Sequence, residues 1–278
     1  MRRVERVQDT GADMFIFDGQ KDLNDWNVAG QFVKSDFFKD VPKSWEELQK
    51  KLVEDWKYGM EVLTSFVKRL KQEAIPDLKS TKRTTTFSME EGEEIDLERL
   101  AQGLPYWKHT EREEKTGPQD VTIIIDTTTI AYRDTDDILW RGACALGLAF
   151  VLEEKGYKVE LWVVNGSYLY TDGRTPVVTA CCLKRPQDPL DLSTLVSTVS
   201  GWFYRSATFT LLRTIGHKTG KEIQYESLGA AYEPRSADLD EVSRDELRIY
   251  SSGVFSFSAA VSMIRGELEK FAAKGEPA

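Results

Sequence analysis

Histidine is scarce in this sequence, and several common catalytic motifs are missing. Only His109 and His217 occur in 278 residues, so general acid–base catalysis by histidine is disfavoured. No Walker loop, no Gly-x-Gly-x-x-Gly turn after a strand-like run and no Gly-x-Ser-x-Gly elbow is present, which disfavours ATP-, NAD- and serine-dependent chemistry. The sequence therefore assigns no catalytic residue, and it favours a protein that is not an enzyme.

Cysteine is also rare, and none of it is spaced for a metal. The three cysteines are Cys144 and the adjacent pair Cys181 and Cys182, so the Cys-x-x-Cys spacing of a structural zinc site does not occur. Neighbouring residues on a strand point to opposite faces, which makes the pair a poor candidate for a disulfide or a chelate. We expect reduced, buried thiols in a cytoplasmic protein.

Long apolar runs and excess positive charge are lacking as well. The longest apolar run, residues 143–152, is too short to span a bilayer, and no apolar stretch follows the N-terminal arginines as it would in a signal peptide. A formal net charge of −9 argues against a membrane partner and does not favour nucleic acid. Two short basic runs, residues 1–3 and 79–83, leave a nucleic-acid role open.

The chain is organised around residues 120–164. A β-branched run over residues 120–126 is typical of a strand buried on both faces of a parallel sheet, and it ends on Asp126. Three threonines follow, then a long helix and a second strand over residues 158–164. Because ligands collect at the carboxyl ends of strands in open α/β sheets, Asp126 and the hydroxyls behind it mark the candidate site.

Flanking segments complete the expected fold. Residues 1–43 predict an arm with at most one strand, which is too aromatic for a disordered tail. A capping box at Ser44 starts a helix that the apolar spacing extends to Leu70. We expect an α/β three-layer sandwich with a mixed, mostly parallel, Rossmann-like sheet. Residues 1–115 would form an N-terminal arm and helical extension, and residues 116–278 the main domain.

The oxygens at the end of the first central strand suit a hard cation. Mg²⁺ prefers oxygen ligands in octahedral geometry, and Asp126, the threonine hydroxyls and the loop acid Asp134 supply them. Asp136 has a structural explanation, because it stands where the N-cap of the long helix is expected. Arg141 either faces a phosphate near Asp126 or, as is more common, pairs with a nearby carboxylate, here Asp137 at helical spacing.

The order of strand, acid, hydroxyls, helix, strand, hairpin and strand resembles the first half of a von Willebrand factor A-type domain. Such domains hold a divalent metal with an Asp-x-Ser-x-Ser loop, a distant threonine and a second aspartate. Asp126 and Thr128 match the first two loop positions, whereas the third falls on Ile130, which has no oxygen. Asp172, in a hairpin, is the candidate for the second aspartate. The resemblance implies a degenerate site for a divalent metal such as Mg²⁺.

A second resemblance extends over residues 40–270. It rests on the helix that begins at Ser44 and on four further segments, residues 92–97, 140–143, 156–160 and 189–193. These segments are similar to uncharacterised proteins of tailed bacteriophages, in a family described as a domain of unknown function. The resemblance implies a viral origin and a place in the host cytoplasm, and it implies no reaction.

Three functions remain open. The first is an interaction or assembly protein that binds a protein partner, or itself, through the loop at Asp126, with or without a divalent metal. The second is a Mg²⁺-dependent phosphoesterase or nuclease that uses Asp126 and neighbouring loop acids. The third is a virion structural or packaging component whose aromatic N-terminal arm docks on a neighbour. We favour the first.

The predicted site has two sets of residues. The candidate metal ligands are Asp126, Thr128, Asp134 and Asp172. The candidate partner-binding residues are Thr127, Thr129 and Arg141.

Overall fold

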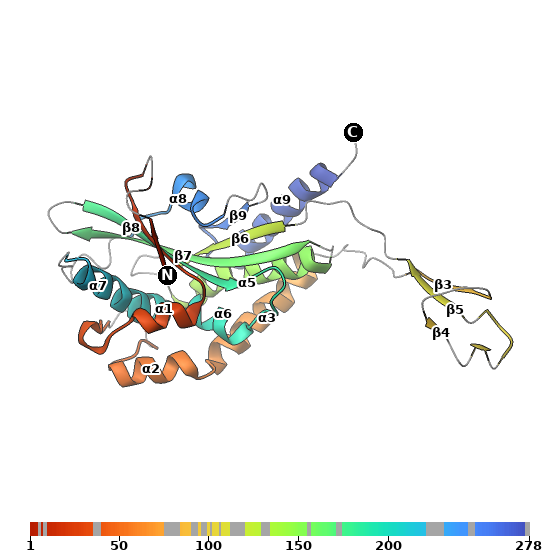
Figure 1. Ribbon diagram of the computed structural model, residues 1–278, viewed down its shortest axis with the longest axis horizontal. Helices are drawn as coiled ribbons and strands as arrows, with labels where there is room; N and C mark the ends of the chain where they lie inside the picture. Colours follow the sequence, from red (N-terminus) through yellow and green to blue (C-terminus); the bar gives the residue numbers. More distant parts are fainter. Residues whose placement is uncertain are drawn as a thin grey trace.

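A six-stranded sheet forms the centre of the molecule (Figure 1). The computed structural model describes residues 1–4, 7, 10–35, 40–74, 84–89, 94–95, 99–100, 102–105, 107–111, 120–128, 134–154, 157–170, 174–220, 231–243 and 248–275. In spatial order the strands are β1 (Arg2–Val4), β2 (Asp13–Phe17), β8 (Arg174–Lys184), β7 (Lys158–Tyr170), β6 (Asp120–Asp126) and β9 (Arg248–Ser251).

The sheet is mixed and mostly parallel. β6 pairs in parallel with β7 on one side and with β9 on the other, and β2 pairs in parallel with β8. β7 and β8 form an antiparallel hairpin, and β1 is an antiparallel edge strand beside β2. The predicted α/β three-layer class, with a mixed and mostly parallel sheet, is therefore confirmed. The short strand β9 lies at one edge of the sheet and is parallel to β6.

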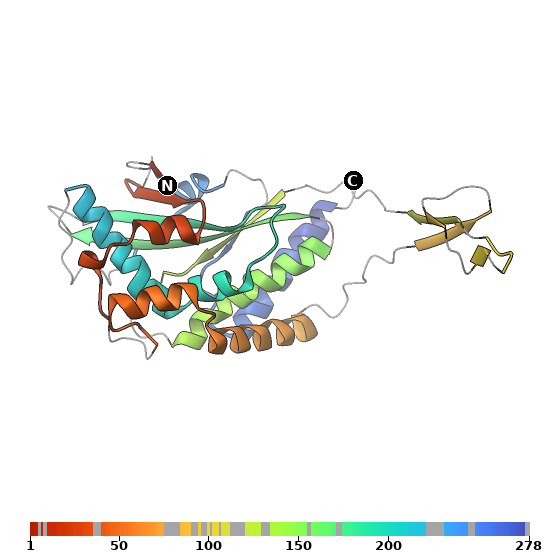
Figure 2. The ribbon, with the colours of Figure 1, turned by 60° about the horizontal axis from the view of Figure 1, so that its bottom comes forward.

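Helices flank the sheet on two faces of unequal cover (Figure 2). The described helices are α1 (Gln20–Trp26), η1 (Ala29–Gln31), α2 (Trp45–Val53), α3 (Lys57–Ala74), α5 (Thr135–Glu154), α6 (Leu192–Thr198), the π-helical turn η2 (Phe203–Thr208), α7 (Phe209–Lys218), α8 (Ser236–Asp240) and α9 (Phe257–Gly275). Within these segments, none is both long enough and apolar enough to cross a membrane.

Alternation along the strands assigns each side chain to a face. Ile123 and Ile125 of β6 join a core with α3, α5 and α9, whereas Ile124 points the other way. That second face is covered by α8 and neighbouring residues such as Tyr232. A strand whose successive residues are all buried must have cover on both faces, as the unbroken apolar run of β6 indicates.

The expected helix from Ser44 to Leu70 is two helices, so that prediction is wrong in its middle. Ser44 does cap α2, because its hydroxyl accepts from the Glu47 amide at 3.2 Å. The chain then turns extended at Glu54, and the Trp56 ring lies edge-on to Trp202 at 6.4 Å. Apolar spacing continues across this break, which is why periodicity alone did not reveal it.

Residues 1–43 contain two strands, whereas the sequence predicted at most one. All five residues of β2 are buried, because this strand lies inside the sheet between β1 and β8. It thereby carries apolar side chains into cores on both faces. The sheet thus takes strands from both sides of the predicted boundary at residue 115.

A second, smaller sheet stands apart from the main body (Figures 1 and 2). Its strands are β3 (Thr84–Ser88), β5 (Trp107–Glu111) and β4 (Glu94–Ile95), paired antiparallel in that spatial order. β3 is rich in threonine, a residue type that favours strands. The pairing of β3 with β5 joins the two ends of this segment.

Candidate functional site

Asp126 closes β6 and is buried, with 3% of its surface exposed. Its Oδ1 atom accepts a hydrogen bond from the Thr128 amide at 2.8 Å. Its Oδ2 atom accepts one from the Tyr250 hydroxyl at 3.0 Å, and a guanidinium nitrogen of Arg141 lies 3.9 Å away. The carboxylate is therefore surrounded by donors from the following loop, from β9 and from α5.

Arg141 holds the backbone at the end of β6. Its Nη1 atom donates to the main-chain carbonyl of Asp126 and, at 2.9 Å, to that of Thr128. The guanidinium carbon lies 4.2 Å from the centroid of the Phe255 ring. Arg141 therefore lies beside the Asp126 carboxylate, which the sequence did not offer as its partner. A phosphate at this position stays a prediction. A buried guanidinium in this geometry fixes three chain segments relative to one another.

Two threonines continue the contact between β6 and β7 past the last strand residue. The Thr127 amide and hydroxyl both donate to the Val164 carbonyl, at 2.9 and 3.1 Å. The Thr128 hydroxyl accepts from the Gly166 amide at 2.8 Å. These hydroxyls point to a neighbouring strand, so they serve first to fix the register at the sheet end.

Gly166 is required at its position. A Cβ atom there would lie 1.9 Å from the Tyr232 carbonyl oxygen, far inside van der Waals contact. The Tyr232 amide also donates to the Gly166 carbonyl at 3.2 Å. The close approach of these two backbones joins β7 to the segment that covers the second face of the sheet.

Burial dominates the acid–base behaviour of this cluster. Burial raises the pKa of Asp126, while Arg141 and the hydrogen bonds from Thr128 and Tyr250 act in the opposite direction without cancelling it. Burial and the nearby Asp126 carboxylate also raise the pKa of Tyr250. Tyr250 therefore stays protonated and acts as a hydrogen-bond donor over the ordinary pH range.

The remaining candidate residues have other positions. Asp134 is exposed just before α5. Asp136 lies inside the first turn rather than at the N-cap, because α5 begins at Thr135, so its assignment as helix cap is wrong. It accepts a hydrogen bond from the Tyr58 hydroxyl at 3.1 Å. Thr129, Ile130 and Asp172 lie outside the described residues.

The described residues supply few ligands for a metal. Among them, no three acidic, histidine or cysteine side chains form a group that could hold a metal ion. Asp126 does lie beside hydroxyl oxygens, but the Arg141 guanidinium 3.9 Å away opposes a second cation at that carboxylate. These residues do not fit Mg²⁺ by themselves. The metal site stays a prediction, since one of its candidate ligands, Asp172, lies outside the described residues.

Sequence reasoning missed Tyr250 and Phe255 as members of the cluster. A signal for Tyr250 is present in the sequence, because the isoleucine and tyrosine of residues 248–250 suit a short strand, and in the structure Tyr250 pairs with Ile124 in the neighbouring strand β6. Alternation then brings its side chain to the same face as Asp126. Phe255 follows a turn, and no pattern in the sequence indicated its contact with Arg141.

Comparison with known proteins gives one family. No curated protein and no solved structure matches this chain. One family model, described as a domain of unknown function, matches residues 20–249. The matched region runs from the start of α1 into β9, so it includes Asp126, Arg141 and the strands that position them. The chain belongs to this family, DUF7192.

Proposed function

We propose that this protein is a non-enzymatic interaction protein that binds a protein partner at the end of the sheet where β6 terminates. The observation that carries the proposal is the internal bonding of Asp126, whose carboxylate oxygens face the Thr128 amide, the Tyr250 hydroxyl and Arg141. An acid bonded in this way cannot exchange a proton with a substrate without losing these contacts. Asp126 instead holds the loop after β6, the strand β9 and the helix α5 in fixed positions relative to one another.

The partner would contact an acidic rim, defined here as Tyr58, Asp134 and Asp136. Tyr58 is 49% exposed and donates to Asp136 at 3.1 Å, and both aspartates are exposed. The helix α5 connects this rim to the bonded cluster around Asp126, since Asp136 and Arg141 both lie on α5. Exposed tyrosine favours protein contacts, and the carboxylates favour a partner with a basic surface.

The test is affinity capture with the full-length protein from cells that express it naturally. The Asp134→Lys/Asp136→Lys variant reverses the charge of the rim. A matched control, Asp188→Lys/Glu269→Lys, makes the same change in net charge at two other exposed positions. We expect a captured protein that the rim variant loses and the control retains. Equal capture by all three proteins, or equal loss in both variants, contradicts the proposal.

A specific observation favours self-assembly as a second candidate. Three of the seven large apolar side chains that are exposed in the described chain lie in the segment of the small sheet, namely Met89 at 54%, Leu100 at 44% and Leu104 at 42%. Exposed apolar side chains gathered in one segment favour a protein contact. A structural or packaging role would then use the small sheet for contact between copies. The N-terminal arm is a poorer candidate for that contact, because its strands β1 and β2 belong to the main sheet.

Sedimentation velocity tests this second candidate. Self-assembly predicts a discrete oligomer of the wild type and a monomer of Leu100→Ser/Leu104→Ser. A control with Val28→Ser, at a position 38% exposed in the main body, should assemble as the wild type does. A monomeric wild type at the concentration reached in the cell contradicts self-assembly.

The remaining predictions need separate measurements. A Mg²⁺-dependent phosphoesterase would cleave a generic phosphodiester, and Asp126→Ala would lose that cleavage. A thermal-shift titration with Mg²⁺ checks metal binding, because an ion that binds only the native state raises its melting temperature. We place the protein in the cytoplasm, where its three buried, free cysteines would stay reduced. Phage origin and a von Willebrand A-like core stay predictions.

A further inference from the structure

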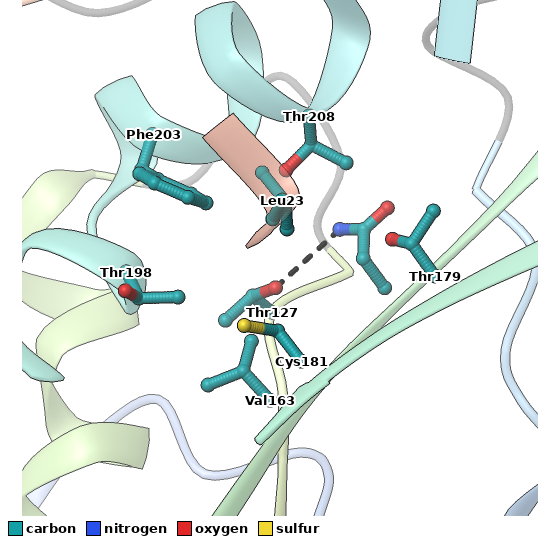
Figure 3. Close-up of a pocket in the computed structure, with 9 residues that line it drawn as sticks. Leu23, Thr127, Val163, Thr179, Cys181, Thr198, Phe203 and Thr208 are labelled. Carbon is teal, nitrogen blue, oxygen red and sulfur yellow. Dashed lines mark hydrogen bonds between the residues drawn. The ribbon is translucent and has the colours of Figure 1, made fainter. Parts of the chain in front are cut away.

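A small cavity lies next to the end of β6, on the face of the sheet that carries α1, α6 and the π-helical turn η2 (Figure 3). Its lining residues come from separate parts of the chain. Thr127 follows β6, Thr179 belongs to β8, Thr198 ends α6 and Thr208 ends the π-helical turn. All four are buried. The cavity is thus a place where strands and helices meet, rather than a surface groove.

Five of the side chains that line the cavity carry a hydroxyl or an amide group. Besides the four threonines, the Asn165 side chain of β7 reaches the cavity. The Thr127 and Thr198 hydroxyls already donate to the Val164 and Thr194 carbonyls, at 3.1 and 2.7 Å, so among the described lining residues the free hydroxyl donors are those of Thr179 and Thr208. Leu23, Val163 and Phe203 supply part of the apolar remainder. A threonine hydroxyl can donate one hydrogen bond and accept two, and an asparagine amide can donate two and accept two. The cavity therefore offers both donors and acceptors to a small polar molecule.

Asn165 supplies a second, independent observation. Its side chain is buried, with 4% exposed. The Nδ2 atom makes one long hydrogen bond of 3.4 Å to the Thr127 hydroxyl. The Oδ1 atom has no hydrogen-bond partner among the described residues. Buried polar atoms almost always have a partner, either in the protein or in ordered water, so this oxygen points to a ligand that can donate.

The size and charge of the cavity restrict that ligand. Its volume is about 10 Å³, close to the roughly 10–15 Å³ that one water molecule needs on this scale. The cavity is too small for an organic metabolite. No acidic side chain lines it, so a bound cation would carry an uncompensated charge in a buried site. A single neutral molecule with donors and acceptors satisfies both restrictions.

We propose that this cavity binds one water molecule, which donates a hydrogen bond to Asn165 Oδ1 and bonds to the threonine hydroxyls around it. The water links β7 to β8 and to the π-helical turn. It also contacts Thr127, which directly follows Asp126. The water is therefore a structural component of the sheet end, and this assignment does not depend on the proposed partner.

A crystal structure of the full-length protein, at a resolution that shows ordered water, is the direct test. We expect one peak within about 2.6–3.2 Å of Asn165 Oδ1 and of at least one threonine hydroxyl. A cavity without a peak overturns the proposal. So does a peak with several oxygen contacts near 2.4 Å, because that distance indicates a bound cation.

A pair of threonine variants tests the water in solution. Thr208→Val keeps the shape of the side chain and removes a hydroxyl from the cavity. Thr214→Val is the control for the loss of a buried hydroxyl as such, because Thr214 is also buried, on the adjoining helix α7, and does not line the cavity. We expect Thr208→Val to lower Tm by about 2–4 °C and Thr214→Val to leave Tm unchanged or higher. Equal Tm values for the two variants contradict a bonded water at Thr208.

Discussion

Two buried aspartates on the same face of the sheet, Asp126 and Asp238, have closely similar surroundings. Asp238 is 0% exposed and accepts hydrogen bonds from the Tyr232 hydroxyl at 2.7 Å, the Arg235 amide at 2.9 Å and the Thr10 hydroxyl at 2.6 Å. Asp126 likewise accepts from a tyrosine hydroxyl and a backbone amide. Each aspartate therefore joins segments that are far apart in the sequence.

The difference between them is the third donor. Asp238 receives a neutral hydroxyl, whereas Asp126 lies beside the Arg141 guanidinium, which also bonds the backbone around it. Asp238 fastens the start of α8 to the N-terminal segment. Asp126 stands at a strand end, where α/β proteins commonly bind ligands. The repeated Asp–Tyr pair indicates that this bonding pattern is structural here, and that Arg141 is the feature that sets Asp126 apart.

Removing Arg141 should have the largest effect. Arg141→Ala leaves a buried carboxylate without its cation and frees two carbonyl groups, and we expect a loss of about 3–5 kcal/mol in the free energy of unfolding. Urea denaturation measures it. Arg235→Ala is the control at the second aspartate, because the exposed Arg235 bonds Asp238 through its amide, and its cost should stay within about 0.5 kcal/mol. Equal costs would remove the distinction between the two sites.

Gly166→Ala should have the next largest effect, because it pushes apart the backbones of Gly166 and Tyr232. A loss of about 1–3 kcal/mol is expected from overpacking at a contact that cannot yield. Gly147→Ala serves as the control, since its Cβ would meet Ile264 at an ordinary 3.5 Å. That change inside α5 should be neutral or stabilising. A stable Gly166→Ala protein would show that the segment covering the second face is not held at this point.

The two tyrosines allow a finer comparison. Tyr232→Phe removes a 2.7 Å hydrogen bond to Asp238, and Tyr250→Phe removes a 3.0 Å bond to Asp126. We expect a loss of about 1–2 kcal/mol for the first variant, because Tyr232 is the more buried of the two, and about 0.5–1 kcal/mol for the second. Chemical denaturation distinguishes them. The reverse order would mean that the Arg141 site depends on its tyrosine more than the Asp238 site does.

The pH dependence of Asp126 is the subtlest test. Burial raises the pKa of Asp126 in the folded protein above its ordinary value of 3.8, so the folded state binds this proton more tightly than the unfolded chain does. The stability of the wild type relative to Asp126→Asn should therefore be highest below the unfolded pKa. It should fall as the pH rises through the folded pKa. A difference in unfolding free energy that grows with pH would contradict the raised pKa.

The position of Asp126 at the end of a strand could be predicted from the sequence, but the residues that bury it could not. The β-branched run of β6 and the carboxylate behind it follow local rules, so the strand and the position of Asp126 could be predicted. Its burial depends on Arg141, Tyr250 and Phe255, which approach from other elements. Helical spacing offered Asp137 as a partner for Arg141, and the tertiary structure brings Asp126 instead.

The helix break shows a second limit of local rules. Leu52, Trp56 and Met60 keep helical spacing across the extended residue Glu54. Gly59 is a trace of the break in the sequence, because a Cβ atom at this position would lie 2.1 Å from the Trp56 ring. A glycine that makes room for a tryptophan three residues earlier is recognisable only once the direction of that ring is known.

The pairing of β2 with β8 has a consequence for how the chain is made. Asp13 lies opposite Val177 and Phe17 opposite Cys181, so β2 leaves the ribosome long before the strand with which it pairs. Contacts so distant in sequence form slowly, and an unpaired apolar strand is prone to aggregate meanwhile. We therefore expect the nascent chain to depend on a chaperone until the β7–β8 hairpin has been synthesised.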